Sequence, residues 1–285
     1  MKKEVLSLHE AIYDPIADLS TWRAMPTRSI GHLDPFLFLN HHGPQKYGPN
    51  NNGLPFGPHP HRGFETLTFV LQGDITHKDS VTGESVIKAG GIQWMTAGSG
   101  LIHAEVSSDE FKRNGGMEEV IQIWMNLPAK FKMTPPKYTG LQKDSIPAIA
   151  FGEGKGVLHL TSGSYQGQQG PVESITNLFT ATLELKSGGV FQDDLPAGSQ
   201  VLLYVVNGQV QVNGASAREH QLVEVSTAGT ELSITATQDS QLVYCHGIPF
   251  EEPIVAHGPF VMNTHDEIRQ AIMDYQSGKL GSMAL

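Results

Sequence analysis

Three histidines and one glutamate form two pairs, and the members of each pair are two residues apart. His59 and His61 lie in Gly-Pro-His-Pro-His-Arg-Gly, and His103 and Glu105 lie in Gly-Leu-Ile-His-Ala-Glu. Side chains two residues apart on a β-strand point to the same face. Two such strands, paired inside a barrel, would bring four ligands to one point. Three neutral imidazoles and a carboxylate suit a divalent transition metal, and iron is the best-known occupant of such mixed sites.

A second carboxylate competes for this site. The segment from His59 to Glu65, between Gly53 and Gly73, resembles the first motif of the cupin barrels, where the glutamate after the His-x-His pair is usually a ligand. Glu65 has the same strand parity as His61, so five candidates compete for a site that usually takes four protein ligands. Because the two-residue spacing pairs Glu105 with its histidine, we expect Glu105 to bind the metal and Glu65 to play a supporting part.

The predicted ligand set also defines the chemistry. Fe(II) with three neutral histidines and one carboxylate carries a local formal charge of about +1, which attracts an anionic oxygen ligand. Open coordination positions would admit a substrate and O₂. If Glu105 loosens from the ion, it can take the proton of an acidic substrate hydroxyl as a general base, and the metal stabilises the resulting anion. Glu105 is therefore the predicted catalytic residue.

Composition restricts the class of protein. The formal net charge of −10 and the pI near 5.7 argue against a broadly basic surface that binds nucleic acid. Cys245 is the single cysteine, so an intramolecular disulfide is impossible. Neither an apolar leader nor a run of roughly 18 apolar residues is present, so we expect a cytoplasmic protein that does not span a membrane.

Short apolar runs between turn signals predict an all-β architecture. One strand is expected over 66–71, ending before Gly73 and Asp74, and an apolar run covers 201–206. Asn207-Gly208 follows that run and precedes Val210, which predicts a β-hairpin at this position.

The two halves of the chain resemble one another. Phe-Val-Leu-Gln-Gly at 69–73 aligns with Tyr-Val-Val-Asn-Gly at 204–208, an offset of 135 residues. This predicts a duplicated barrel, with domains at 1–135 and 151–285 and a proline-rich linker at 136–150.

One helix is expected near the end of the chain. Thr264 and Glu267 have the spacing of a capping box, and apolar residues follow at helical spacing before Gly278. This pattern predicts an amphipathic helix over 265–276 that packs on a barrel.

Several longer blocks narrow the resemblance. The chain resembles the pirin family in His-Pro-His-Arg-Gly-Phe-Glu-Thr (59–66), Gln-Trp-Met-Thr-Ala-Gly (93–98), Gly-Leu-Ile-His-Ala-Glu (100–105), Leu-Asp-Pro-Phe-Leu (33–37) and His-Gly-Pro-Phe-Val-Met-Asn-Thr (257–264). The resemblance implies a bicupin, two tandem cupin-type barrels, with iron bound in the N-terminal barrel by His59, His61, His103 and Glu105. At the offset of 135, His59 and His61 correspond to Asp194 and Pro196, so the second barrel is expected to hold no such metal.

The resemblance also implies two alternative functions. Some bacterial pirins, like the cupin quercetinases, cleave flavonols with O₂, which makes a quercetin 2,3-dioxygenase type of activity the first expectation. Its substrates would be an aromatic or flavonol molecule and O₂. Pirins of higher organisms resemble iron-dependent redox sensors that contact transcription factors, which makes a regulator with a protein partner the alternative.

Overall fold

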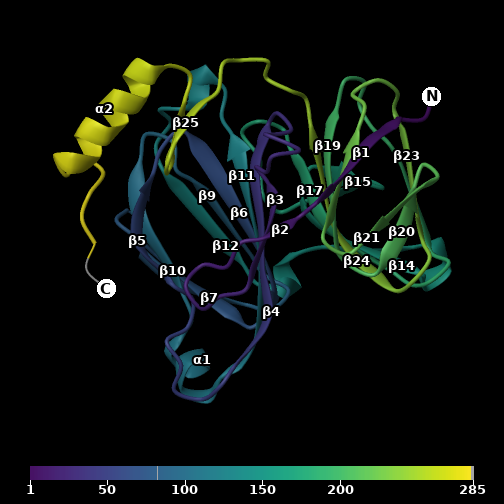
Figure 1. Ribbon diagram of the computed structural model, residues 1–285, viewed down its shortest axis with the longest axis horizontal. Coiled ribbons are helices and arrows are strands. Elements are labelled where there is room, and N and C mark those ends of the chain that lie inside the picture. Colours follow the sequence, from purple (N-terminus) through teal and green to yellow (C-terminus); the bar gives the residue numbers. More distant parts are fainter. Residues whose placement is uncertain (82, 284–285) are drawn as a thin grey trace. The chain divides into compact units, whose positions relative to one another are not determined.

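The computed structural model describes residues 1–81 and 83–283, and the chain is built mainly of β-strands (Figure 1). The predicted all-β architecture is confirmed. The chain divides into two compact units, which we call the first and the second barrel. The first barrel comprises Tyr13–Thr21, Leu37–Lys143 and Phe250–Leu285, and the second comprises Met1–Ile12, Trp22–Phe36 and Asp144–Pro249.

Two antiparallel sheets form the first barrel. One runs in the order β12-β9-β6-β11-β4, with strands β12 (Lys137–Leu141), β9 (Ile92–Thr96), β6 (Phe64–Gln72), β11 (Gly116–Asn126) and β4 (Phe36–Tyr47). The other runs in the order β5-β10-β7-β8, with strands β5 (Phe56–His61), β10 (Leu101–Val106), β7 (Asp74–Asp79) and β8 (Gly83–Lys88). The short helix α1 (Asp109–Asn114), the hairpin β25 (Val255–His257) with β26 (Phe260–Met262), and helix α2 (His265–Gln276) complete this unit.

The second barrel repeats this plan. One sheet runs β1-β22-β19-β24-β17-β14-β13, with strands β1 (Val5–Glu10), β22 (Gln221–Val225), β19 (Gln200–Asn207), β24 (Ser240–Gly247), β17 (Phe179–Leu185), β14 (Gly156–Ser162) and β13 (Ala148–Phe151). The other runs β18-β23-β20-β21, with strands β18 (Val190–Asp194), β23 (Glu231–Ala236), β20 (Gln209–Val212) and β21 (Ala215–Arg218). The remaining elements are β2 (Ile12–Tyr13), β3 (Thr21–Met25), β15 (Ser164–Tyr165), β16 (Gln168–Gln169) and the 3-10 turns Ala129–Phe131, Lys143–Ser145 and Gly152–Gly154.

The predicted hairpin at Asn207-Gly208 is wrong. Strands β19 and β20 exist on either side of this turn, but they belong to different sheets and pair with other strands. Gly208 has a φ of 82°, and a Cβ at this position would lie 2.3 Å from the carbonyl oxygen of Asp239. The turn is therefore a tight corner that takes the chain from one sheet to the other, where only glycine fits.

The same corner occurs in the first barrel and explains the internal repeat. Strand β6 ends before Gly73, whose φ is 80°, and β7 then enters the other sheet. The matched segments 69–73 and 204–208 thus occupy equivalent corners. By the same correspondence, β18 of the second barrel is the equivalent of β5.

The N-terminal segment of the chain belongs to the second barrel, and the C-terminal segment belongs to the first. Strand β1 pairs with β22 at the edge of the second barrel's larger sheet, as β12 pairs with β9 in the first barrel. Residues 250–285 belong to the first barrel, where α2 contacts β25 and β26 (Figure 1). The division along the sequence into 1–135 and 151–285 stays a prediction, and the spatial units are interleaved in sequence.

The predicted linker contains two strands, β12 and β13, and each forms one end of its sheet. Its two prolines, Pro136 and Pro147, each lie directly before a strand, so neither removes a backbone N–H from within it.

Helix α2 begins where the sequence predicts. The Thr264 hydroxyl accepts a hydrogen bond of 3.2 Å from the backbone N–H of Glu267, and the Glu267 carboxylate accepts one of 2.8 Å from the backbone N–H of Thr264. The capping box is therefore confirmed. No helix among residues 1–81 and 83–283 is long and apolar enough to cross a membrane.

The side chains that share one face of β11 differ in polarity along the strand. Trp124, Gln122, Val120 and Glu118 are spaced by two residues and share one face of this strand. Val120 packs in an apolar cluster with Leu19, Tyr47, Leu54, Val70, Ile75, Ile87 and Phe111. This cluster separates the level of Trp124 and Gln122 from Glu118, which lies toward the barrel end that carries α1.

Candidate metal site

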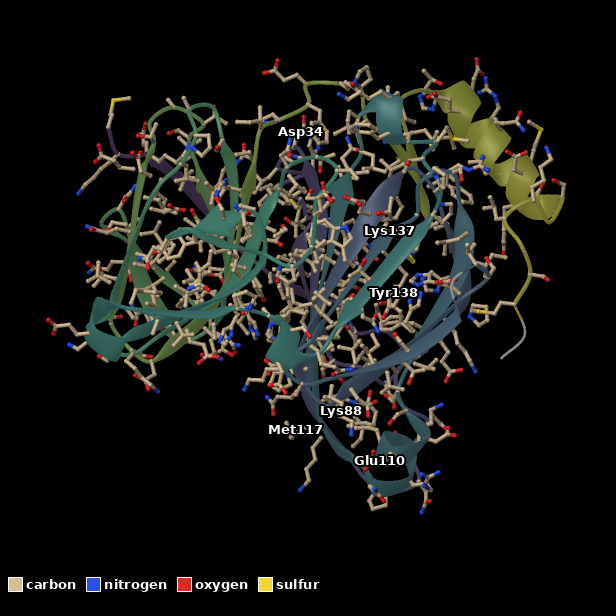
Figure 2. The ribbon with its side chains drawn as sticks, turned by 180° about the vertical axis from the view of Figure 1, so that it is seen from behind. Asp34, Lys88, Glu110, Met117, Lys137 and Tyr138 are labelled. Atoms are coloured by element: carbon tan, nitrogen blue, oxygen red, sulfur yellow. The ribbon has the colours of Figure 1, made fainter. Side chains whose placement is uncertain are left out.

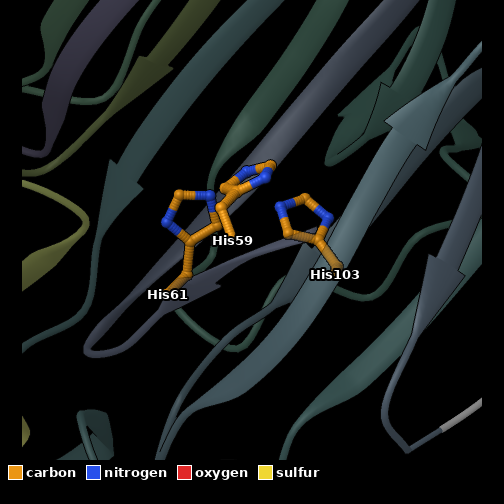
Figure 3. A group of neighbouring side chains, drawn as sticks. All are labelled: His59, His61 and His103. Carbon is orange, nitrogen blue, oxygen red and sulfur yellow. The ribbon is translucent and has the colours of Figure 1, made fainter. Parts of the chain in front are cut away.

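Three histidines converge inside the first barrel. His59 and His61 lie on β5, and His103 lies directly opposite His59 on the antiparallel strand β10. One ligand nitrogen of each ring lies within 4.8 Å of the other two. Figure 3 shows the three rings grouped around a common point. The two-residue spacing of the β5 pair thus produces the expected convergence.

Backbone carbonyls orient two of the rings. The Nδ1 of His59 donates to the carbonyl oxygen of Gly57 at 2.7 Å, and the Nδ1 of His61 donates to that of Pro259 at 3.3 Å. A carbonyl can only accept, so these bonds place the proton on Nδ1 and leave each Nε2 lone pair for an ion. Such bonds to the remote nitrogen are typical of histidines that bind metals.

The third ring carries the clearest sign of a missing ligand. His103 is 1% exposed, and both of its ring nitrogens are buried without a hydrogen-bond partner among the described residues. Buried polar atoms are normally satisfied, so an unpartnered imidazole indicates an absent ligand. A metal ion at the centre of the three rings would satisfy one of these nitrogens.

Burial also keeps two of the imidazoles, His61 and His103, neutral. It lowers the pKa of His61 to about 3, with a smaller effect from neighbouring His59. It lowers the pKa of His103 well below the usual value as well, assisted by His61 and His59. Neutral imidazoles are the form that binds a metal. The donor set therefore fits a divalent transition metal.

Glu105 lies beside this cluster but is held by two other side chains. Its carboxylate accepts a hydrogen bond of 2.7 Å from Gln122 Nε2 and one of 3.3 Å from Thr68 Oγ1. The group of described residues whose ligand atoms lie within 4.8 Å of one another contains the three histidines without Glu105. Its role as the fourth ligand stays a prediction.

Glu65 lies on the other side of the strand wall. It pairs with Thr96 on β9 and is three residues from Thr68, so the two side chains point to opposite faces of β6. Its Oε1 accepts hydrogen bonds from Trp94 Nε1 at 3.0 Å and Thr96 Oγ1 at 2.6 Å. Thr68 donates its hydrogen bond to Glu105 inside the barrel. Because Glu65 lies on the opposite face of β6, its side chain points away from the histidines.

An aromatic wall adjoins His61. The Trp124 ring packs edge-on against His61 with ring centroids 5.3 Å apart, and it stacks on Phe38 at 4.6 Å and lies 4.5 Å from Phe64. Trp124 was not among the candidates found from the sequence. Its alternation with Gln122 along β11 is the signal that places both side chains on the inner face.

His77 is a second residue that sequence analysis missed. Its ring lies 5.5 Å from that of His103 and stacks face to face on Tyr138 at 3.8 Å. The Nε2 of His77 bonds Asp79 Oδ2 at 2.7 Å, and Tyr138 bonds Ser85. A lone histidine carries no spacing signal, so only the strand pairing reveals its position.

Family models and solved structures match nearly the whole chain. A family model described as Pirin matches residues 18–125, and one described as the Pirin C-terminal cupin domain matches residues 180–281. A Pseudomonas aeruginosa protein named "Putative quercetin 2,3-dioxygenase" is 39% identical over 248 residues, which cover 87% of each chain.

The crystal structure of a quercetin 2,3-dioxygenase from Acinetobacter baumannii has a TM-score of 0.94 and 36% identity, and the match covers 100% of both chains. A bacterial pirin from Escherichia coli, solved in complex with nickel(II), has a TM-score of 0.68 at 20% identity, and the match covers 85% of this chain and 99% of that one. These matches confirm the bicupin fold expected from the sequence. The sequence blocks, the two-barrel architecture and the family models agree that this chain belongs to the pirin family.

Proposed function

We propose that this protein is a metal-dependent dioxygenase that cleaves a flavonol such as quercetin with O₂. The observation that carries the proposal is the cluster of three histidines, two of them buried and His59 partly exposed. Similarity to the quercetin 2,3-dioxygenase from Acinetobacter baumannii supports the choice of reaction.

The proposed ligands are His59, His61, His103 and Glu105, and the proposed metal is iron. A six-coordinate ion with these four ligands would keep two positions for the substrate and O₂. When bound, Fe(II) supplies a Lewis acid that stabilises the deprotonated oxygen of the flavonol.

Glu105 is the proposed proton acceptor. Its two carboxylate oxygens are held by Gln122 and Thr68, which come from the opposite sheet of the barrel. These bonds fix the direction of the carboxylate, so that it can receive the proton of the substrate's acidic hydroxyl. The aromatic rings of Trp124 and Phe38 offer apolar surface that suits a planar aromatic substrate and excludes water.

The overall reaction conserves atoms. One flavonol and one O₂ give one ring-opened ester and one molecule of carbon monoxide, with both oxygen atoms of O₂ retained in the products. The flavonol is oxidised and O₂ is the oxidant, so no further reductant is required.

Simultaneous measurement of O₂ uptake and carbon monoxide release tests the proposal. The protein is loaded anaerobically with one Fe(II) per chain and mixed with quercetin and O₂. We expect equal amounts of O₂ consumed and carbon monoxide formed, and neither with His103→Ala. Iron-loaded protein that consumes no O₂ with quercetin contradicts the proposed reaction.

Metal identity needs a separate measurement, because one relative was solved with nickel(II). Elemental analysis of protein purified without added metal, followed by loading with iron or nickel, distinguishes the two. Higher dioxygenase activity with iron supports the proposal, and higher activity with nickel contradicts the choice of iron.

The alternative role, a redox-sensing regulator that binds transcription factors, stays a prediction. Recovery of a partner protein in only one oxidation state of the iron would support it. The expected cytoplasmic location and the absence of direct nucleic-acid binding also stay predictions.

A further inference from the structure

The C-terminal segment of the chain is bonded to the strand that carries two of the histidines. Directly after His61, the backbone N–H of Arg62 donates to the carbonyl oxygen of Pro259 at 3.3 Å. The N–H of Val261 donates to the carbonyl oxygen of Arg62 at 3.0 Å. Residues that lie almost 200 positions away in the sequence therefore extend the end of β5.

The Pro259 carbonyl serves two neighbouring groups. It accepts the backbone N–H of Arg62 and also the ring Nδ1–H of His61 at 3.3 Å. A shift of Arg62 relative to Pro259 would therefore disturb the bond that fixes the tautomer and rotation of the His61 ring.

The side chain of Arg62 is fixed in turn by helix α2. Its Nη1 donates to Asp274 Oδ2 at 2.9 Å, and its Nε donates to the carbonyl oxygen of Ser99 at 2.7 Å. The side chains of Arg62 and Asp274 are 6% and 12% exposed, so water screens this ion pair little. The pair joins the helix to the end of β5 and to the turn that precedes β10.

Asp274 is itself held in place on its other oxygen. Its Oδ1 accepts hydrogen bonds of 2.8 Å from both Gln270 and Lys279. Together with Arg62, these donors hold the pKa of Asp274 well below its ordinary value, with Lys279 contributing most. Both oxygens of the Asp274 carboxylate therefore accept hydrogen bonds, which hold the side chain in one position.

We propose that Asp274 of the C-terminal helix is a positioning residue for the metal ligand His61, acting through Arg62 and the carbonyl of Pro259. It does not touch the reacting atoms. The C-terminal helix thereby tunes the metal site of the first barrel. This inference rests on the proposed metal site, but it does not depend on the flavonol reaction.

Removing the Asp274 carboxylate should weaken metal binding while the first barrel stays folded. Outer hydrogen-bond partners of metal ligands typically contribute 10–100-fold to affinity, and Asp274→Ala is expected to cost about that much. Asp274→Asn keeps an oxygen that can accept from Arg62, so it should restore part of the affinity. Asp266→Ala is the matched control, because Asp266 lies on the same helix and its exposed side chain pairs only locally with Arg269.

The experiment uses the full chain and needs no substrate. Fe(II) affinity is measured anaerobically by competition with a chelator, and Co(II) loading reports the coordination geometry through its visible spectrum. In the metal-free protein, ¹⁵N NMR of the histidine rings reports the His61 tautomer, and thermal unfolding reports the fold. Arg62→Lys, which retains the charge but loses the forked contact to Asp274 and Ser99, repeats the test if Asp274→Ala does not fold.

The inference is supported if Asp274→Ala lowers Fe(II) affinity at least tenfold, changes the Co(II) spectrum and mixes the His61 tautomers, while Asp266→Ala does none of these. Wild-type affinity and spectrum in folded Asp274→Ala overturn it. A wild-type protein that binds no metal overturns the proposed site and this inference together, whereas inactivity toward quercetin in a metal-loaded protein leaves the affinity comparison intact.

Discussion

Gln122 donates a hydrogen bond of 2.7 Å to the carboxylate of Glu105 from the opposite sheet of the first barrel. Glu105 follows His103 by two residues on β10, so the two side chains point to the same face of that strand. The bond is short, which makes it a constraint on the direction of the carboxylate. This contact distinguishes Glu105 from Glu65, the other glutamate that competes for the metal. The Glu65 carboxylate accepts its hydrogen bonds from Trp94 and Thr96 on the other face of β6.

Substituting the two glutamates one at a time tests this separation. Glu105→Gln should lower Fe(II) affinity by about 10-fold or more, because it removes the carboxylate of the proposed fourth ligand. Glu65→Gln is the matched control and should leave Fe(II) affinity nearly unchanged. Chelator competition measures both variants. Equal losses of affinity, or a larger loss for Glu65→Gln, would show that the wrong carboxylate has been assigned to the metal.

His103→Ala should abolish strong metal binding and leave the barrel folded. The ring is a proposed ligand, and neither of its nitrogens has a hydrogen-bond partner among the described residues, so the substitution removes no hydrogen bond between them. Elemental analysis after dialysis and circular dichroism measure the two effects. His159→Ala is the control, since His159 lies in the second barrel beside Glu184. Unfolding of His103→Ala would instead show that the ring is required for the fold.

A buried acid at the far end of the first barrel predicts a loss of stability as the pH rises. Glu118 is fully buried, and in the part of the chain that the structure describes neither of its carboxylate oxygens has a side-chain partner. Burial and, to a smaller extent, neighbouring Asp74 raise the pKa of Glu118 to about 9. Its ordinary pKa is about 4.3, so between these two values the folded state holds a proton that the unfolded state has lost. The free energy of unfolding should therefore fall with rising pH in this window, by up to about 1.4 kcal/mol per pH unit.

Glu118→Gln removes this titration and keeps the shape of the side chain. Urea unfolding at several pH values between about 5 and 8 should show a flatter profile for Glu118→Gln than for the wild type. The control is Glu110→Gln at the same end of the barrel, where exposed Glu110 faces Lys88 at 3.6 Å (Figure 2). Parallel profiles for the wild type and Glu118→Gln would refute the raised pKa.

Lys3 should contribute substantially to the stability of the second barrel. It is 1% exposed, and its ammonium group donates to the carbonyl oxygens of Ser199, Ser226 and Thr227 at 2.8, 3.1 and 3.3 Å. Lys3→Met leaves three carbonyls without this donor and should cost about 1.5–3 kcal/mol. Urea unfolding measures the loss, and Lys2→Met, at an exposed neighbour, should cost almost nothing. Equal stability of the two variants would argue against a structural role for the buried ammonium.

Local patterns in the sequence were sufficient for several features. The strand ending at Gly73 and the capping box of Thr264 and Glu267 were predicted correctly, because alternation and capping depend on residues close in the chain. The spacing of His59 and His61 placed both side chains on one face for the same reason. The turn at Asn207-Gly208 shows the limit of such signals: the turn exists, but the strands on either side enter different sheets. Local turn chemistry does not encode which strands pair.

The sequence alone therefore determined the duplicated all-β architecture, the family blocks and the histidine spacing. Only the tertiary structure decided that the two glutamates have different partners, Glu105 bonding Gln122 and Thr68 in the facing sheet and Glu65 bonding Trp94 and Thr96. It also placed His77 beside His103 and joined Arg62 to Asp274 across 212 positions of sequence. These relationships arise from packing between distant segments, and no short-range pattern records which segments will meet.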